Sequence, residues 1–306
     1  MRPAANNRDM KTQDFIDTNE FTEQQILDIM NLGVTLKACV RADYFPPLLR
    51  RRGVILLPTG EPALYDAMCE VAATELGASF RTVSVPLDEP ETLREAAMQL
   101  DRCGELLLVR AKRHETLLAL AKYADAPLVS LGSPHSLPVQ EIADLITMYE
   151  HLPREKKLED CKVVFYGENG AACASALYAC SKIGMQFVQI VTKKGGELTP
   201  PQLKSAERNV KKSGGTYAVS ENAAEAFRGA DFLFMDAPLS QKLPPDAESG
   251  ILRIDPTENR IAALRAVLTC MLYRNPAARD TLVIEKMKRM LTIKLQTIFG
   301  FGEAGE

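Results

Sequence analysis

Hydrophobic positions recur three or four residues apart near the start of the chain. Between residues 22 and 40 they form a single stripe of apolar residues, which predicts an amphipathic helix. Thr22 and Gln25 precede this stripe with the three-residue spacing of a capping box, in which each side chain satisfies a free backbone N–H. The first helix is therefore expected to begin at Thr22.

Short apolar runs alternate with helical stretches in the next part of the chain. Strands are predicted at 53–58, 80–84, 105–109 and 127–131, and helices from Pro62 to about Gly77, at 90–102 and at 114–124. Strands that alternate with helices at this spacing indicate βαβ units. They predict a parallel sheet.

A long helix at 138–151 and a charged stretch lead from this series to a second one. The second series has strands at 161–167, 186–191, 216–219 and 231–236, and helices at 171–183, 199–213 and 221–229. An extended segment at 250–255 and two helices, at 257–273 and 276–298, follow. The pattern predicts a second parallel sheet of the same kind.

A length of 306 residues is that of about two domains of ordinary size. We expect an α/β protein with two doubly wound parallel-sheet domains joined by long helices. The N-terminal domain is expected to span 1–136 and to be completed by the helices of 257–306, and the C-terminal domain to span 137–256.

Charge and composition narrow the class of partner. The net charge is −3, so a nucleic-acid partner, which needs a concentrated positive surface, is not expected. No stretch of eighteen uncharged apolar residues occurs, and the first residues contain no apolar signal segment, so no membrane partner is expected. Seven cysteines without a CxxC pair suit a reducing compartment, which predicts a cytoplasmic protein. The three histidines lack metal-site spacing, and no metal is expected.

Five segments, taken in order, resemble the aspartate/ornithine carbamoyltransferase family, and its ornithine branch in particular. They are DFIDTNEFTEQQILDIMNLGVTLK, SPHSLPVQEIADLITMYEH, VVFYGENG, DFLFMD and ENRIAALRAVL. The resemblance implies the carbamoyltransferase fold, with a first domain for carbamoyl phosphate and a second for an amino acid. It also implies trimers with sites at subunit interfaces, and transfer of a carbamoyl group to an amine without a metal or organic cofactor.

The phosphate-binding loop departs from that family. After the strand at 53–58 the family carries Ser-Thr-Arg-Thr-Arg at the start of a helix, where backbone N–H groups and guanidinium groups hold the phosphate. The corresponding positions here, 62–66, read Pro-Ala-Leu-Tyr-Asp. Loss of two arginines and gain of a carboxylate predict poor binding of carbamoyl phosphate. Thr59 and Gly60 remain as candidate anion donors.

Three further positions bear on the first half of the site. Arg110 matches the family arginine that contacts the carbamoyl group and the phosphate, and Gln140 matches the last residue of the family's HPxQ motif. Leu137 stands where that motif has the histidine that polarises the carbonyl oxygen. His135, two residues earlier, is the candidate to replace it, and Arg110, His135 and Gln140 are the candidate catalytic residues.

In the second half, Asp236 and Ser240 match two residues of the family's Asp-x-x-x-Ser-Met-Gly loop. The Met-Gly pair and the His-Cys-Leu-Pro loop that follows in the family have no counterpart here. Glu168 and Asn169 approximate the family's ligand loop after the first strand of this half. These four residues, with Thr59 and Gly60, are the candidate substrate-binding residues.

Intact scaffold motifs beside lost chemical ones predict a non-catalytic or repurposed member. Its ligand is expected to be an amino acid or an acyl phosphate, and its assembly a homotrimer or a hetero-oligomer with an intact paralogue. One alternative is an active carbamoyl- or related one-carbon-group transferase acting on an amino acid amine. The other is an NADP-dependent oxidoreductase, because Gly167-Glu168-Asn169-Gly170-Ala171 opens a helix after a strand and Lys193-Lys194 follows the next strand.

Overall fold

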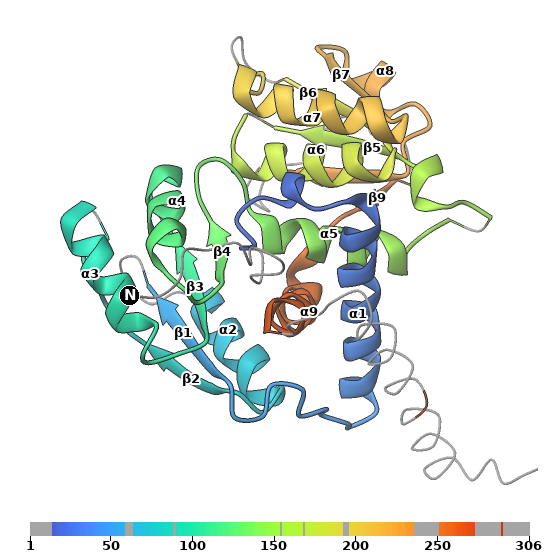
Figure 1. The fold of residues 1–306 in the computed structure, drawn as a ribbon. Coiled ribbons are helices and arrows are strands. Elements are labelled where there is room, and N and C mark those ends of the chain that lie inside the picture. Colours follow the sequence, from blue (N-terminus) through green and yellow to red (C-terminus); the bar gives the residue numbers. More distant parts are fainter. Residues whose placement is uncertain are drawn as a thin grey trace, which may run out of the picture.

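Two parallel sheets form the framework of the protein, as seen in a computed structural model (Figure 1). The structure describes residues 14–58, 64–87, 90–153, 155–167, 169–191, 196–235, 251–272 and 289. The predicted α/β class with two parallel sheets is confirmed. The predicted helix at 276–298 lies outside the described residues, apart from position 289.

The first sheet has four strands in the order β2-β1-β3-β4. They are β1 (Gly53–Leu57), β2 (Ser79–Thr82), β3 (Leu106–Arg110) and β4 (Leu128–Gly132). All pairings are parallel, and β1 pairs with both β2 and β3, so the order reverses between β1 and β3. Ligands of doubly wound sheets bind beyond the carboxyl ends of strands at such a reversal.

Alternate side chains of this sheet enter two different cores, as expected for strands covered on both faces. One face packs against α3 (Pro90–Leu100) and α4 (His114–Tyr123). The other packs against α2 (Leu64–Glu75) and joins the main core. That main core also contains α9 (Arg260–Leu272), which returns from the end of the described chain to lie beside α1 and α2.

The second sheet has five parallel strands in the order β7-β6-β5-β8-β9. They are β5 (Lys162–Tyr166), β6 (Gln186–Ile190), β7 (Thr216–Ser220), β8 (Phe232–Met235) and β9 (Leu252–Arg253). The helices α6 (Ala171–Ile183) and α7 (Pro200–Ser213) pack side by side on one face. The short α8 (Ala223–Phe227) covers apolar residues of the other face.

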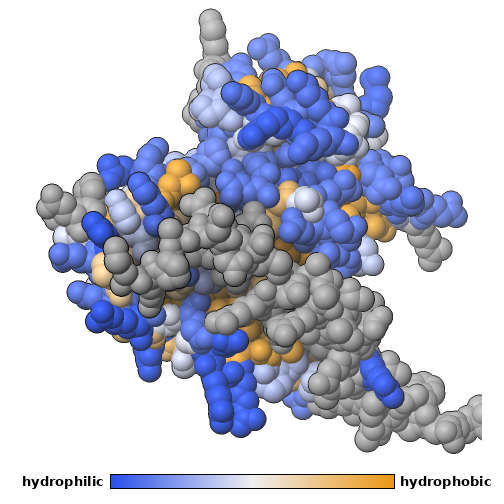
Figure 2. Space-filling model, viewed as in Figure 1, coloured by the Kyte–Doolittle hydropathy of each residue, from blue (hydrophilic) through white to orange (hydrophobic). Residues whose placement is uncertain are grey.

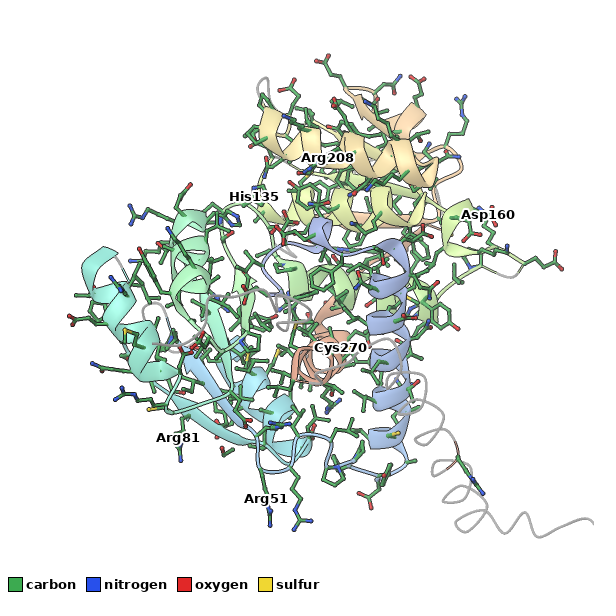
Figure 3. The ribbon with its side chains drawn as sticks, in the orientation of Figure 1. Arg51, Arg81, His135, Asp160, Arg208 and Cys270 are labelled. Atoms are coloured by element: carbon green, nitrogen blue, oxygen red, sulfur yellow. The ribbon has the colours of Figure 1, made fainter. Side chains whose placement is uncertain are left out.

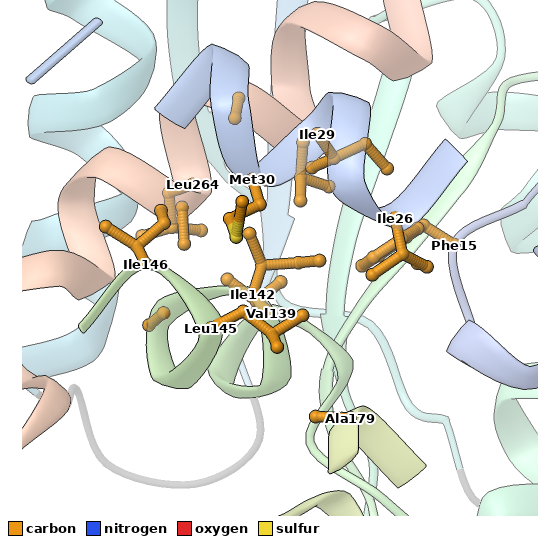
Figure 4. Close-up of a cluster of buried hydrophobic side chains, with 14 of the residues drawn as sticks. Phe15, Ile26, Ile29, Met30, Val139, Ile142, Leu145, Ile146, Ala179 and Leu264 are labelled. Atoms are coloured by element: carbon orange, nitrogen blue, oxygen red, sulfur yellow. The ribbon is translucent and has the colours of Figure 1, made fainter. Parts of the chain in front are cut away.

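Helix α5 (Pro138–Glu150) lies between the two sheets and packs against α1 (Glu23–Arg41), α6 and α9 (Figure 1). Its residues 141–148 are all buried, polar ones included. Figure 4 shows apolar side chains of α5, among them Ile142 and Ile146, meeting those of α1 and α9. Gly33 permits this close approach, because a Cβ there would lie 2.5 Å from Cδ1 of Ile146.

The predicted elements largely occur where the pattern placed them. The capping box of α1 forms as expected, since Thr22 Oγ1 accepts from the N–H of Gln25 and Gln25 Oε1 accepts from that of Thr22. Two regions differ from the prediction. The segment 250–255 contributes only the two residues of β9 to the sheet, and the first turn expected at 257 is a separate 3-10 turn, η3 (Pro256–Asn259), before α9. The proposed domain limits at 136 and 256 stay a prediction.

Two carboxyl groups of α5 lie in this buried environment. Glu141 accepts a short hydrogen bond from Thr18 Oγ1, and Asp144 Oδ1 accepts from Gln140 Nε2 at 2.8 Å. Burial raises the pKa of Glu141 well above its usual value. It raises that of Asp144 to about 7, although the hydrogen bond from Gln140 and the charge of Arg260 act in the opposite direction. Both groups favour the protonated form far more than exposed carboxyls do.

Removing an apolar side chain from the centre of α5 is expected to lower stability strongly. Ile142 is 0% exposed, so Ile142→Ala should reduce the free energy of unfolding by about 2–5 kcal/mol through lost burial and a residual cavity. Val71→Ala on α2, where the side chain is 39% exposed, is the matched control and should change it by less than about 0.5 kcal/mol. Urea denaturation followed by circular dichroism measures both. Equal losses in the free energy of unfolding for the two variants would contradict the burial of Ile142 at the centre of the core.

The raised pKa of Asp144 predicts a pH-dependent stability. The folded state binds the proton up to about pH 7, whereas the ordinary pKa is 3.8, so folding takes up protons between these values. This group therefore stabilises the fold less as pH rises through that window, by up to about 4 kcal/mol. Asp144→Asn should remove this contribution, and its stability relative to the natural chain should increase from pH 5 to pH 8. A difference that stays constant over this range in urea denaturation would refute the assignment.

Candidate functional site

A pocket of about 500 Å3 lies beyond the carboxyl ends of the first sheet's strands. It adjoins the point where the strand order reverses between β1 and β3, the position expected for a ligand in this class of sheet. The segment 59–63, which follows β1 and contains the candidate donors Thr59 and Gly60, lies outside the described residues. The pocket is lined by Tyr65, Arg110, Ala111, Lys112, Leu131, Gly132, Ser133, Pro134, Leu137, Gln140 and Arg260.

Two arginines from distant parts of the chain meet over one aromatic ring in this pocket. Arg110 ends β3 and Arg260 begins α9, and their guanidinium carbons lie 5.3 Å and 6.0 Å from the ring centroid of Tyr65. Such cation–π contacts stabilise the position of a cationic side chain over an aromatic ring by about 0.5–2 kcal/mol each. With Lys112, the described lining residues include three cationic side chains and no carboxylate. The arrangement suits a ligand with negative charge.

Gln140 is held in place by hydrogen bonds on both sides of its amide. Arg260 Nε donates to Gln140 Oε1 at 2.9 Å, and Gln140 Nε2 donates to Asp144 Oδ1 at 2.8 Å. These two hydrogen bonds link Asp144, on the buried face of α5, to Arg260 in the pocket wall. They also orient one guanidinium group toward a fixed partner, which limits the conformational entropy lost when a ligand binds.

Leu137 lines the pocket at the position where the resemblance implies a histidine. It directly precedes α5 and packs over Gly132, where an added Cβ would lie 2.7 Å from Cδ2 of Leu137. Gly132 also has a φ of 141°, a backbone conformation that residues other than glycine rarely adopt. The end of β4 is thus shaped to accept an aliphatic side chain, which cannot donate a hydrogen bond to a carbonyl oxygen.

His135 is not among the pocket-lining residues. Its Nε2 lies 3.5 Å from Oδ2 of Asp17, and its ring lies 4.6 Å from that of His114 and 5.9 Å from that of Tyr178. Although burial raises the pKa of Asp17, hydrogen bonds from His135 and Asn19 outweigh it and lower that pKa below its usual value. The imidazole therefore faces the ionised carboxylate of Asp17, and its ring lies near that of Tyr178 on α6.

The remaining predicted residues belong to the second sheet. Asn169 follows β5, and its Nδ2 donates to the carbonyl oxygen of Glu197 at 2.9 Å, away from the Arg110 pocket lining. Glu168, Asp236 and Ser240 lie outside the described residues. The structure thus brings together Arg110 and Gln140 of the predicted set, and it does not bring His135 or Asn169 into the same lining.

Sequence reasoning missed Arg260, Tyr65 and Lys112 as pocket residues. Arg260 is the third residue of the Glu-Asn-Arg segment, whose resemblance to the family gives it no role in the site. Tyr65 stands within the segment that replaces the family's phosphate-binding motif, yet its ring contacts both arginines. Asp66, which was expected to repel an anion, is not part of the pocket lining. The spacing of residues along the chain could not show which side of the helix each one faces.

Within the described residues, no group of three or more His, Cys, Asp or Glu side chains could hold a metal ion. The helices of that same part of the chain include none long and apolar enough to cross a membrane.

Comparisons with known proteins agree with the architecture. The family description "Aspartate/ornithine carbamoyltransferase, carbamoyl-P binding domain" matches residues 13–150, and the description of its "Asp/Orn binding domain" matches residues 159–250. The putrescine carbamoyltransferase of Mycoplasma mycoides subsp. mycoides is 29% identical over 259 residues, covering 81% of this chain and 70% of the relative. The catabolic ornithine carbamoyltransferase of Clostridium perfringens is 30% identical over 233 residues, covering 74% and 68%.

A solved structure supports the same fold. Ornithine carbamoyltransferase from Pyrococcus furiosus superimposes with a TM-score of 0.76 at 22% identity, over 85% of this chain and 96% of that one. The two matched regions together span most of the chain; the first contains the first sheet, and the second contains strands β5 to β8 of the second sheet. The chain belongs to the aspartate/ornithine carbamoyltransferase family.

Proposed function

We propose that this family member binds a small anionic ligand, an acyl phosphate or an amino acid carboxylate, in the Arg110 pocket and does not carry out ordinary transcarbamylation. The observation that carries this proposal is the combination of retained and missing groups in one pocket. Arg110, Arg260 and Gln140 converge there, and Leu137 occupies the place of the expected histidine.

The retained groups support binding. Guanidinium groups form charge-assisted hydrogen bonds with carboxylates and phosphates, each worth about 1.5–3 kcal/mol. A volume of about 500 Å3 is within the usual range for small-molecule sites. The relatives named putrescine and ornithine carbamoyltransferase support ligands of the acyl-phosphate and amino-acid classes. The acceptor part of the site, with Asp236 and Ser240, belongs to the same proposal.

The missing groups argue against catalysis. Attack of an amine on a carbonyl carbon places negative charge on the oxygen, and preorganised donors at that oxygen usually supply the largest part of the rate enhancement. Leu137 offers no donor, and His135 is engaged toward Asp17 rather than the pocket. The proposal extends to a cytoplasmic protein, supported by seven free cysteines, and to a homotrimer or an assembly with an intact paralogue, supported by the family resemblance.

An active transferase with a different donor or acceptor is the second candidate. It is favoured by the convergence of Arg110, Gln140 and Arg260, because these groups could still orient a donor. Incubation of the purified chain with carbamoyl phosphate and either ornithine or putrescine separates the two candidates. We expect no citrulline or carbamoylputrescine above the uncatalysed level. Sustained turnover would overturn the non-catalytic proposal in favour of this second one.

Removal of one guanidinium group tests the binding pocket itself. Arg110→Gln should weaken the affinity for carbamoyl phosphate or inorganic phosphate at least about tenfold, since it removes a charge-assisted hydrogen bond. Arg102→Gln, at an exposed position after α3, is the matched control and should leave the affinity unchanged. Isothermal titration calorimetry measures both. Equal affinities in the two variants would exclude Arg110 from the ligand site.

A further inference from the structure

A second cavity, of about 310 Å3, lies between the start of α1 and the layer formed by α6 and α7. Among the described residues, none lines both this cavity and the Arg110 pocket. Its walls come from both halves of the chain. The lining residues are Asn19, Glu20, Phe21, Thr22, Glu23, Lys182, Arg208, Asn209, Lys212 and Ser213.

Hydrogen bonds between remote segments hold these walls together. Lys182 Nζ donates to the carbonyl oxygen of Phe21 at 2.7 Å, and Asn209 Nδ2 donates to Asn19 Oδ1 at 2.7 Å. The same Asn209 amide also lies 3.2 Å from Ser181 Oγ. Because Lys182 and Asn209 are buried, the base of the cavity is a defined part of the fold and not a gap between exposed side chains.

Three cationic side chains converge on this cavity. Lys182 is only 7% exposed and forms its floor, while Arg208 and Lys212 lie one helical turn apart on the exposed face of α7. Figure 3 shows Arg208 on this helix, and Figure 2 shows that the α7 surface in this view is largely hydrophilic. Lys212 has no hydrogen bond or ion pair within the described part of the chain, and Lys182 uses one of its three ammonium protons on Phe21.

The ammonium groups are close enough to affect one another. Burial lowers the pKa of Lys182 below its usual value, and the charges of Lys212 and Arg208 lower it further, against the opposing effects of Glu141 and Asp17. Glu20 and Glu23 also line the cavity, so the ionisable side chains among its described lining residues are three cations and two carboxylates. The N-terminus of the long helix α1 also lines the cavity, and it places the positive end of the helix dipole there.

We propose that this cavity is a second ligand site, which takes a small molecule through a carboxylate or phosphate group held by Lys182, Arg208 and Lys212. An anion there relieves the repulsion among the three cations and uses donors that the fold leaves available. The ligand contacts the segment 19–23, at the start of α1, and the helices α6 and α7 together. Its binding therefore stabilises the arrangement of α1 against α6 and α7.

The test uses the full-length Arg110→Gln variant as parent, so that binding in the Arg110 pocket does not obscure the second site. Inorganic phosphate and succinate are titrated by calorimetry into this parent and into two derivatives. In the Arg208→Gln/Lys212→Gln derivative the affinity should fall at least about tenfold. In the control, Lys204→Gln/Lys211→Gln, two exposed cations of α7 outside the cavity lining are removed, and the affinity should stay within about twofold.

Each outcome is decisive. Binding of phosphate alone assigns a phosphate-bearing ligand, and binding of succinate alone a carboxylate-bearing one. The proposal is overturned if neither probe binds the parent, or if the Arg208→Gln/Lys212→Gln derivative binds as tightly as the parent. It is also overturned if both derivatives lose affinity equally, because the effect is then one of general surface charge. The fold of every variant is checked by its thermal melting curve. Failure of this site leaves the result for Arg110 in the natural chain untouched.

Discussion

The burial of residues 141–148 of α5 on every side is the constraint on which the rest of the structure depends. This helix has no solvent-facing stripe between residues 141 and 148, so it must be covered by elements from both halves. Helices α1 and α9 cover it on the side of the first sheet, and α6 covers it on the side of the second. A helix of this kind cannot shift or rotate without exposing apolar surface or unpairing a buried polar group. It therefore fixes the position from which Leu137 and Gln140 reach the pocket.

Polar contacts reinforce this packing at the far end of the helix. Lys37 Nζ lies 2.7 Å from Glu150 Oε2 and 2.6 Å from Asn259 Oδ1, so α1, α5 and η3 meet at one ammonium group. Asn259 Nδ2 in turn donates to Thr147 Oγ1 at 2.9 Å. Arg260 directly follows Asn259. The same network therefore fixes the backbone position from which the Arg260 side chain extends toward Tyr65. The binding site and the scaffold are thus built from neighbouring residues of the same segments.

The hydrophobic pattern predicts the order and type of most of the described helices and strands, because buried parallel strands and amphipathic helices each leave a distinct period in the sequence. Residue spacing and resemblance together indicated Arg110 and Gln140. They could not indicate that Tyr65 supports two arginines, or that Asp66 stays out of the pocket lining, since these facts depend on the rotation of α2 relative to β3. They also could not place His135, because a loop between a strand and a helix has no period from which to infer a direction.

The return of α9 to the first half has a consequence for the order in which the protein can form during synthesis. Residues 260–272 supply core side chains beside α1 and α2, yet the ribosome adds them only after the whole second sheet. A nascent chain that ends before residue 260 leaves apolar faces of α1, α2 and α5 uncovered, a state prone to association with other chains. The half of the molecule that is translated first is therefore the half whose core is closed last.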